Sequence, residues 1–289
     1  MQVIGDSDIK LANGVEMPRL FQGLPLIMGL KDIDLNQFKR IIENSYNANI
    51  KGLDTSHDYG KSERFIGKSI KMLVKEGLVE RDDFFITSKI GNAQQYEGNI
   101  ENYVDESLKT LGLEQLDLML LHWPVPGHYI ENWKKLEKIY RKGKVKAIGI
   151  ANARVRHLEA MEGVAEIIPH VVQTEIHPFN VCEDLQAYCK HKHIALQACS
   201  SLCLMIALVK ENPTLLQLGV KYDKSVAQIM LRWSIQCGIA PIFRAFKTHH
   251  IQEISDIFSF EITKEDMNTI STLNQNFRYH PESSNCAGF

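Results

Sequence analysis

GLDTSHDYGKSERFIGKS, residues 52–69, joins a short apolar run that ends in Asp54 to a segment whose apolar side chains have helical spacing. The helical spacing continues from Ile66 to Leu73, and we expect Ser62 to be the N-cap of this helix. Both Gly-Lys-Ser triplets resemble the end of a phosphate-binding P-loop, but neither has a glycine five positions earlier, as that loop requires. The stretch therefore predicts a strand followed by a helix.

The same order of a short apolar run and a helical segment recurs along the chain. Most runs are continuously apolar, as expected of parallel strands covered on both faces. We interpret these ranges as strands: 20–22, 51–54, 84–89, 116–122, 147–152, 171–175, 194–199 and 239–243. Eight strand–helix units predict a closed (β/α)8 barrel, with residues 1–289 as a single domain. The alternative, a doubly wound sheet, needs a GxGxxG fingerprint, which the sequence lacks.

The two ends of the chain are expected to lie outside the strand–helix repeat. Residues 9–18 predict a hairpin around Asn13-Gly14 that closes the bottom of the barrel. Residues 276–289 are expected to form a tail near the substrate pocket. Several helices are expected to stop at a glycine, namely Gly112, Gly143 and Gly238.

The composition limits the possible partners. The chain has 33 Lys and Arg residues against 35 Asp and Glu, a net charge of −2 and a pI near 6.6, so its global charge favours neither nucleic acid nor a membrane surface. The six cysteines show no CxxC spacing, and no apolar run reaches membrane-spanning length. We therefore expect free thiols, a cytoplasmic location and a small-molecule partner.

Four polar side chains stand at or just after the ends of consecutive strands. Asp54 ends one strand, Tyr59 follows in its loop, and Lys89 and His122 end the next two. Each alone is more often an edge charge, a turn residue or a packing residue. Together they predict a catalytic group, because chemistry on such barrels is carried at the C-terminal strand ends.

The chemistry of this group suits proton donation. An unperturbed tyrosine has a pKa of about 10, too high for efficient donation near neutral pH. We expect the Lys89 ammonium to lower the pKa of Tyr59, Asp54 to keep Lys89 charged, and a neutral His122 to orient an electrophilic oxygen.

These segments resemble the aldo-keto reductase family. GLDTSHDYG is similar to its DTAxxYG motif, FFITSKIG to its lysine strand, LDLMLLHWP to its histidine strand, VVQTEIHPF to NQxExHP, and ANGVEMP to its opening hairpin. The resemblance covers residues 9–279 in family order. It implies NADPH-dependent reduction of aldehydes or ketones, reversible as alcohol oxidation, with Tyr59 as general acid. NADH remains a possible cofactor.

The resemblance also implies cofactor-binding residues. It implies contacts to the nicotinamide from Asn152 and Gln173, and a close approach of the cofactor at Gly23. The remaining positions that match the family's cofactor contacts are Cys199, Ser200, Leu202, Arg244, His250 and Glu253. Three of these depart from the usual pattern: Cys199 replaces a stacking aromatic residue, Arg244 a lysine, and His250 an arginine. Ala245 likewise replaces a serine.

The substrate pocket is the least determined part. Pro25, Trp123 and Tyr129 are expected to contact substrate, while Pro25 and Gly91 take positions where relatives often carry aromatic residues. An alternative function, a cofactor-binding regulatory or redox-sensor barrel with little turnover, is motivated by the departures at Cys199, Arg244 and Ala245. The run Cys189–His193 suggests zinc only weakly, because no second ligand pair has metal spacing, so no metal site is expected.

Overall fold

Eight parallel strands close into a barrel in the computed structural model, which describes residues 8–26, 32–281 and 285–286. The strand order β10-β3-β4-β5-β6-β7-β8-β9 follows the chain except where β10 closes the ring against β3. The strands are β3 (Phe21–Gly23), β4 (Gly52–Asp54), β5 (Phe85–Ile90), β6 (Leu116–Leu121), β7 (Val145–Ala151), β8 (Val171–Glu175), β9 (Ala195–Cys199) and β10 (Ala240–Phe243). The predicted (β/α)8 barrel is therefore confirmed.

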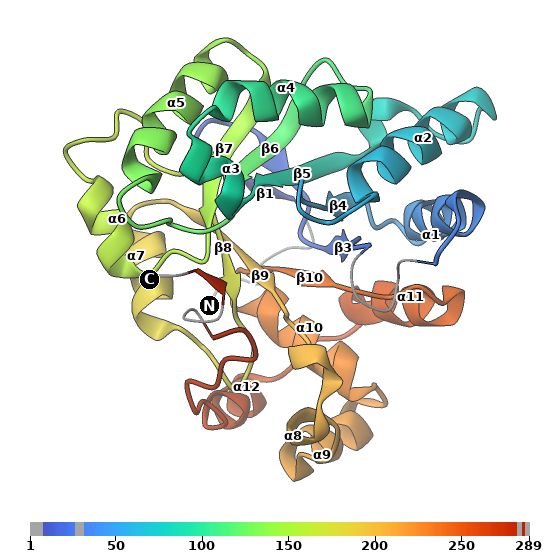
Figure 1. Cartoon of the computed structure of the whole chain (residues 1–289). Coiled ribbons are helices and arrows are strands. Elements are labelled where there is room, and N and C mark those ends of the chain that lie inside the picture. Colours follow the sequence, from blue (N-terminus) through green and yellow to red (C-terminus); the bar gives the residue numbers. More distant parts are fainter. Residues whose placement is uncertain (1–7, 27–31, 282–284, 287–289) are drawn as a thin grey trace.

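Helices surround the strands on the outside of the barrel (Figure 1). They are α1 (Leu35–Asn47), α2 (Ser62–Lys75), α3 (Asn92–Glu97), α4 (Ile100–Leu111), α5 (Tyr129–Arg141), α6 (Val155–Met161), α7 (Glu183–His191), α8 (Ala207–Lys210), α9 (Pro213–Tyr222), α10 (Val226–Gln236), α11 (Thr248–Ser255) and α12 (Lys264–Ser271). Short 3-10 turns lie at η1 (Arg81–Asp83), η2 (Cys203–Met205) and η3 (Asp256–Phe258). The α8–α9 excursion follows β9 and projects at the bottom of the view in Figure 1.

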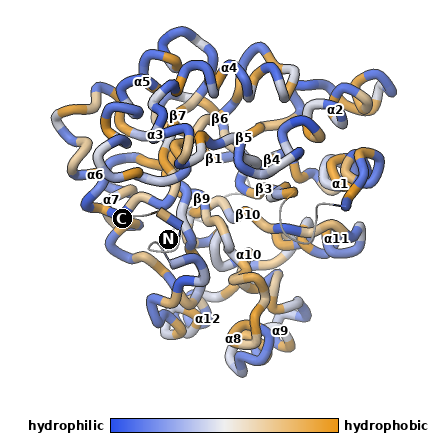
Figure 2. Tube along the Cα trace, in the orientation of Figure 1, coloured by the Kyte–Doolittle hydropathy of each residue, from blue (hydrophilic) through white to orange (hydrophobic). Residues whose placement is uncertain are grey.

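Alternate residues of each strand enter two different cores, and apolar segments accordingly run through the middle of the molecule (Figure 2). On β6, Leu118 and Leu120 belong to the cluster inside the barrel, while Met119 and Leu121 pack against the helices. This period of two directs every second side chain inward. The next inward position after Leu120 is His122, directly beyond the strand end.

The N-terminal hairpin pairs β1 (Ile9–Lys10) with β2 (Glu16–Met17) and closes the bottom of the barrel, as expected. Met17 is fully buried in the interior cluster. The Asn13 side chain donates to the carbonyl of Lys146, 2.9 Å away, and accepts from Val15 N at 3.3 Å. These bonds fix the turn against the start of β7.

The predicted helix ends are partly correct. Gly112 ends α4 with a left-handed φ of +71°, as expected of a C-terminal glycine. The N-cap prediction at Ser62 is wrong, because Lys61 occupies that position and Ser62 is the first helical residue. The Ser62 hydroxyl instead donates to Leu24 O and accepts from Thr55 Oγ1, so it links the ends of β3 and β4 to α2. Within the described part of the chain, no helix combines the length and hydropathy of a transmembrane span.

Candidate active site

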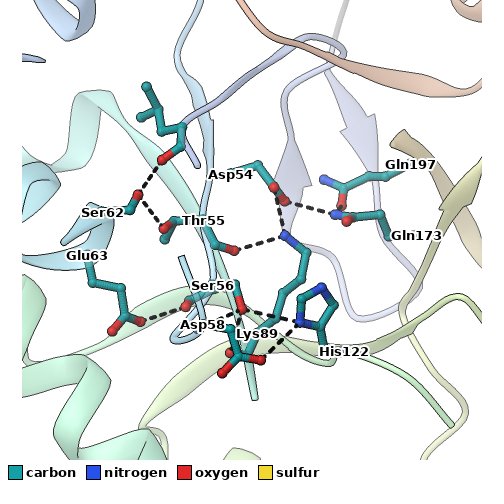
Figure 3. A network of polar contacts seen from close by, with 12 residues as sticks. Asp54, Thr55, Ser56, Asp58, Ser62, Glu63, Lys89, His122, Gln173 and Gln197 are labelled. Atoms are coloured by element: carbon teal, nitrogen blue, oxygen red, sulfur yellow. Dashed lines mark hydrogen bonds and ion pairs between the residues drawn. The ribbon is translucent and has the colours of Figure 1, made fainter. Parts of the chain in front are cut away.

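A buried ion pair joins the ends of β4 and β5 (Figure 3). Lys89 Nζ donates to Asp54 Oδ1 at 2.7 Å and to Thr55 O at 2.9 Å, and the Lys89 side chain is only 1% exposed. A buried ammonium requires such compensation, because desolvation otherwise strongly disfavours its charge. Asp54 and Lys89 therefore lie together as predicted.

Two glutamines extend this polar layer across the barrel. Gln173 Nε2 donates to the second carboxylate oxygen of Asp54 at 2.9 Å and to Gln197 Oε1 at 3.0 Å, as Figure 3 shows. Gln197 in turn donates to the sulfur of Met17 in the hairpin. The Gln173 amide nitrogen thus supports Asp54, and Gln197 is a polar partner that the sequence analysis missed. Its inward position in the β9 run ALQAC was the available signal.

Tyr59 lies above the ion pair and is half-buried. Lys89 Nζ is 5.1 Å from the centre of the Tyr59 ring, and the rings of Tyr59 and His122 meet edge to face at 5.8 Å. Burial raises the pKa of Tyr59 well above its usual value, and the negative charges of Asp54 and Asp58 act in the same direction. The expected lowering of this pKa by Lys89 is therefore wrong for the free protein. Asp54 already balances the ammonium.

His122 is held by the β4 loop through one ring nitrogen. Its Nδ1 lies 3.3 Å from Ser56 Oγ and 3.6 Å from Asp58 Oδ2. Burial lowers the pKa of His122, the Lys89 charge acts in the same direction, and Asp58 opposes both. The expectation of a neutral His122 is consistent with this direction. Ser56 and Asp58 were not among the predicted site residues.

Several residues that are predicted to contact the nicotinamide lie at or after the ends of β7 and β9. Asn152 leaves β7 with a φ of +60° and donates its side-chain amide to His122 O at 3.0 Å, which places it beside the candidate catalytic group. Cys199 is partly exposed at the end of β9, and burial raises the pKa of its thiol to about 12. Ser200 follows with a φ of +48°, and Leu202 packs on the outer core.

Among the predicted adenosine-side residues, Arg244 precedes α11, His250 lies in its first turn, and Glu253 lies in its second half. Arg244 and His250 are exposed, and Lys247 stands at the N-cap of α11, whose first turn contains no acidic residue. Helix N-termini and basic side chains both attract phosphate groups. This donor set fits an anionic ligand such as the 2′-phosphate of NADP. Lys247 was missed in the sequence analysis, although its position before the helix was readable.

Two predicted residues lie on the loop after β3. At Gly23 an added Cβ atom would lie 3.2 Å from both Ile242 Cγ2 and Phe243 O, so strand packing already requires this glycine. Pro25 is half-buried, next to Leu26, whose carbonyl would be 2.9 Å from a Cβ atom at Gly60. Pro25 thus lies close to the Tyr59 loop.

The two aromatic residues that are predicted to contact substrate, Trp123 and Tyr129, lie in different apolar clusters. Tyr129 is buried in the outer core, and its hydroxyl is directed at His157 O, 3.5 Å away. This packing argues against a substrate contact for Tyr129. Trp123 instead forms a small separate cluster with Val125 and Cys286 from the C-terminal tail.

The described part of the tail crosses the end of β8. Both Glu175 carboxylate oxygens accept backbone N–H groups, from Tyr279 at 2.6 Å and His280 at 3.0 Å. Although burial opposes it, hydrogen bonding by these amides and His177 lowers the pKa of Glu175. Asn92 of α3 contacts Asn285 O at 2.9 Å, so the tail also reaches the β5 side. Residues 282–284 and 287–289 of the predicted tail lie outside the described residues.

The sequence also matches a protein family model, described as the aldo/keto reductase family, over residues 25–275. The chain belongs to this family. Two Bacillus subtilis relatives are each 40% identical: the uncharacterized oxidoreductase YtbE, with 95% of both chains covered, and glyoxal reductase, with 94% of this chain and 95% of the relative covered. A Bombyx mori aldo-keto reductase (AKR2E4) solved in complex with NADP superposes with a TM-score of 0.88 at 28% identity, covering 97% of this chain and 96% of that one.

Membership of the aldo/keto reductase family confirms the resemblance inferred from the sequence. It also confirms the expected reaction class, NADP-dependent reduction of carbonyl groups. Among the described residues, histidine, cysteine, aspartate and glutamate side chains form no group of three arranged to hold a metal ion.

Proposed function

We propose that Tyr59 is the proton donor of an NADPH-dependent aldehyde or ketone reductase, with Asp54, Lys89 and His122 as its catalytic partners. The observation that supports this most is the Lys89 ammonium, which is buried against Asp54 at 2.7 Å and lies 5.1 Å from the Tyr59 ring. Burying the Lys89 ammonium beneath the half-buried Tyr59 phenol costs free energy. A role in proton transfer from that phenol explains why the buried charge is present.

The reaction adds a hydride to the carbonyl carbon and a proton to its oxygen, giving an alcohol. Bound NADPH supplies the hydride. Tyr59 supplies the proton as negative charge develops on the oxygen. An alkoxide is far more basic than a phenolate, so even a phenol with a raised pKa transfers its proton downhill. Lys89 then stabilises the phenolate that remains, and solvent restores the proton.

His122 and Asn152 complete the orientation of the reacting groups. The His122 ring meets that of Tyr59 at 5.8 Å, so an oxygen near the tyrosine hydroxyl is also within reach of the imidazole. The amide nitrogen of Asn152 is bonded to His122 O, which fixes the direction of its side-chain carbonyl oxygen. We assign Asn152 and Gln173 to the nicotinamide amide, with Gly23, Cys199, Ser200 and Leu202 lining the same face.

Arg244, His250 and Glu253 are assigned to the adenosine end of the cofactor. The exposed basic groups at the start of α11, Lys247 included, support NADPH over NADH because only NADPH carries a 2′-phosphate. Comparing the dissociation constants of the two cofactors tests this preference. Equal affinities would contradict it.

The physiological carbonyl is not identified by the fold, because loops set specificity on this scaffold. Pro25 and Trp123 remain candidate substrate contacts. The similarity to glyoxal reductase makes glyoxal a reasonable first substrate, together with 4-nitrobenzaldehyde as a reactive neutral aldehyde. We also propose a cytoplasmic location, supported by six cysteines that are all free thiols.

Tyr59→Phe tests the proton-donor assignment. We expect kcat to fall by about 100-fold or more, the usual contribution of a general acid, while NADPH affinity stays nearly constant. Consumption of NADPH is followed at the absorbance band of reduced nicotinamide. Tyr46→Phe, the same substitution beside Phe84 at the opposite end of β5, is the matched control.

Normal turnover by Tyr59→Phe would overturn the assignment. Tight NADPH binding by the wild-type protein without turnover across a broad panel of carbonyls would instead favour the regulatory or redox-sensor function.

A further inference from the structure

Asp58 is an acidic residue at the barrel mouth to which the proposed mechanism gives no role. Its Oδ2 lies 3.6 Å from His122 Nδ1, and its side chain is 40% exposed. Its backbone N–H donates to Ser56 Oγ at 3.3 Å, and the same hydroxyl contacts His122 Nδ1. Figure 3 shows the carboxylate and the Ser56 hydroxyl meeting the same nitrogen of His122, while the other ring nitrogen faces away.

The space for this carboxylate is provided by Gly91, directly after β5. A Cβ atom at Gly91 would lie 1.9 Å from Asp58 Oδ2 and 2.4 Å from the carboxyl carbon. Gly91 has a φ of −67°, which any residue adopts, so backbone conformation does not explain the glycine. The missing side chain is accounted for by the carboxylate that occupies its place. Asp58 and Gly91 therefore form one structural feature, although they are far apart in sequence.

The charge of Asp58 is poorly balanced at neutral pH. A hydrogen bond with His122 lowers the pKa of Asp58, and the charge of His57 and the Gln94 amide act in the same direction, so the carboxylate is ionised. Burial lowers the pKa of His122 below its usual value, so the imidazole is mainly neutral at pH 7. Lys89 is already paired with Asp54. Among the described residues, Asp58 forms an ion pair with His122 and with no lysine or arginine. A negative charge thus stands beside the ring that we assign to the substrate carbonyl.

We propose that Asp58 is a specificity residue, which disfavours carbonyl substrates carrying an anionic group near the reactive carbon and favours neutral or cationic ones. This inference rests on the proposed function of the same site. A substrate oxygen on the far side of the His122 ring lies one imidazole width from the Asp58 charge. At such separations charges interact appreciably in a partly buried site, and salt weakens the effect.

Three short aldehydes, in which any charge lies within one or two bonds of the carbonyl carbon, test the proposal: glyoxylate as the anion, glycolaldehyde as the neutral substrate and betaine aldehyde as the cation. The measured quantity is the ratio of kcat/KM for each charged aldehyde to that for the neutral one. In Asp58→Asn we expect the anionic-to-neutral ratio to rise by about tenfold and the cationic-to-neutral ratio to fall, at low ionic strength. Both changes should shrink in high salt.

Two further variants sharpen the test. Gly91→Ala displaces the carboxylate without removing it, so both ratios should move in the same direction as in Asp58→Asn. Asp82→Asn removes an exposed carboxylate in η1, at the opposite end of β5, and should keep the wild-type ratios. Circular dichroism checks that each variant is folded.

Unchanged ratios in an active Asp58→Asn protein would overturn the inference and leave the proposed function standing. Absence of NADPH consumption with all three aldehydes in the wild-type protein would overturn the proposed function, and the inference with it.

Discussion

Removing one member of the Asp54–Lys89 pair should destabilise the protein more than removing both. In Asp54→Asn the ammonium of Lys89 stays buried without an opposite charge, and its remaining acceptors, such as Thr55 O at 2.9 Å, are neutral. In Lys89→Met the Asp54 carboxylate stays buried, with only the Gln173 amide at 2.9 Å. Breaking a buried ion pair in this way costs about 3–5 kcal/mol of the free energy of unfolding.

The double variant Asp54→Asn/Lys89→Met leaves no uncompensated charge. Replacing a whole buried pair is often close to neutral, so its loss should be far smaller than the sum of the two single losses, which is about 6–10 kcal/mol. The implied coupling energy is on the order of 3 kcal/mol or more. A single domain is typically stable by about 5–15 kcal/mol, so losses of this size fall within the measurable range.

Urea unfolding followed by far-UV circular dichroism gives the four free energies of this cycle. The exposed pair Glu131–Lys134, 3.0 Å apart on α5, provides the control cycle, in which the coupling should stay below about 1 kcal/mol. Additive losses for Asp54 and Lys89, within about 0.5 kcal/mol, would refute the reasoning that each charge exists to compensate the other.

Three other predictions follow from the site and its surroundings. Asp58→Asn should lower the pKa of His122, because the carboxylate stabilises the imidazolium; NMR titration of the ring should therefore show protonation at lower pH than in the wild type. Arg244→Ala and Lys247→Ala should each weaken NADPH binding by about tenfold and leave NADH binding nearly unchanged, as measured by fluorescence titration. Glu175→Gln should speed hydrogen exchange at the two tail amides that the carboxylate holds; unchanged exchange would show that other contacts fix the tail.

The barrel was predictable because its signals are local. Each strand appears as a short apolar run, and glycines such as Gly112 mark helix ends where the backbone needs a positive φ. The Ser62 error has the same origin, because a serine before an apolar run is a typical N-cap. Only the three-dimensional structure shows that its hydroxyl is already bonded to Leu24 O and Thr55. A local pattern cannot report a contact made by a distant strand.

The residues of the candidate site that lie at strand ends could be predicted from the sequence. The contact that depends on the space left by a missing side chain could not. Asp54, Lys89 and His122 follow from strand ends and inward-facing positions. The Asp58–Gly91 contact does not, because nothing in either segment indicates that a missing side chain at one position makes room for a carboxylate at the other. Tyr129 is the opposite case. Its place in a loop at the barrel mouth suggests a substrate contact, but it is the first residue of α5 and its side chain packs in the outer core.

The direction of the Tyr59 pKa shift shows why single pairwise arguments fail in a buried network. An ammonium near a phenol lowers its pKa only to the extent that the ammonium is uncompensated. Burying Lys89 requires Asp54, and Asp54 then adds a negative charge of its own beside the phenol. Proton transfer changes this balance, because the new phenolate is itself a partner for Lys89. The Lys89 ammonium therefore stabilises the protein most when Tyr59 loses its proton during the reaction. We expect it to increase the rate of proton transfer more than it changes the pKa of Tyr59 in the resting protein.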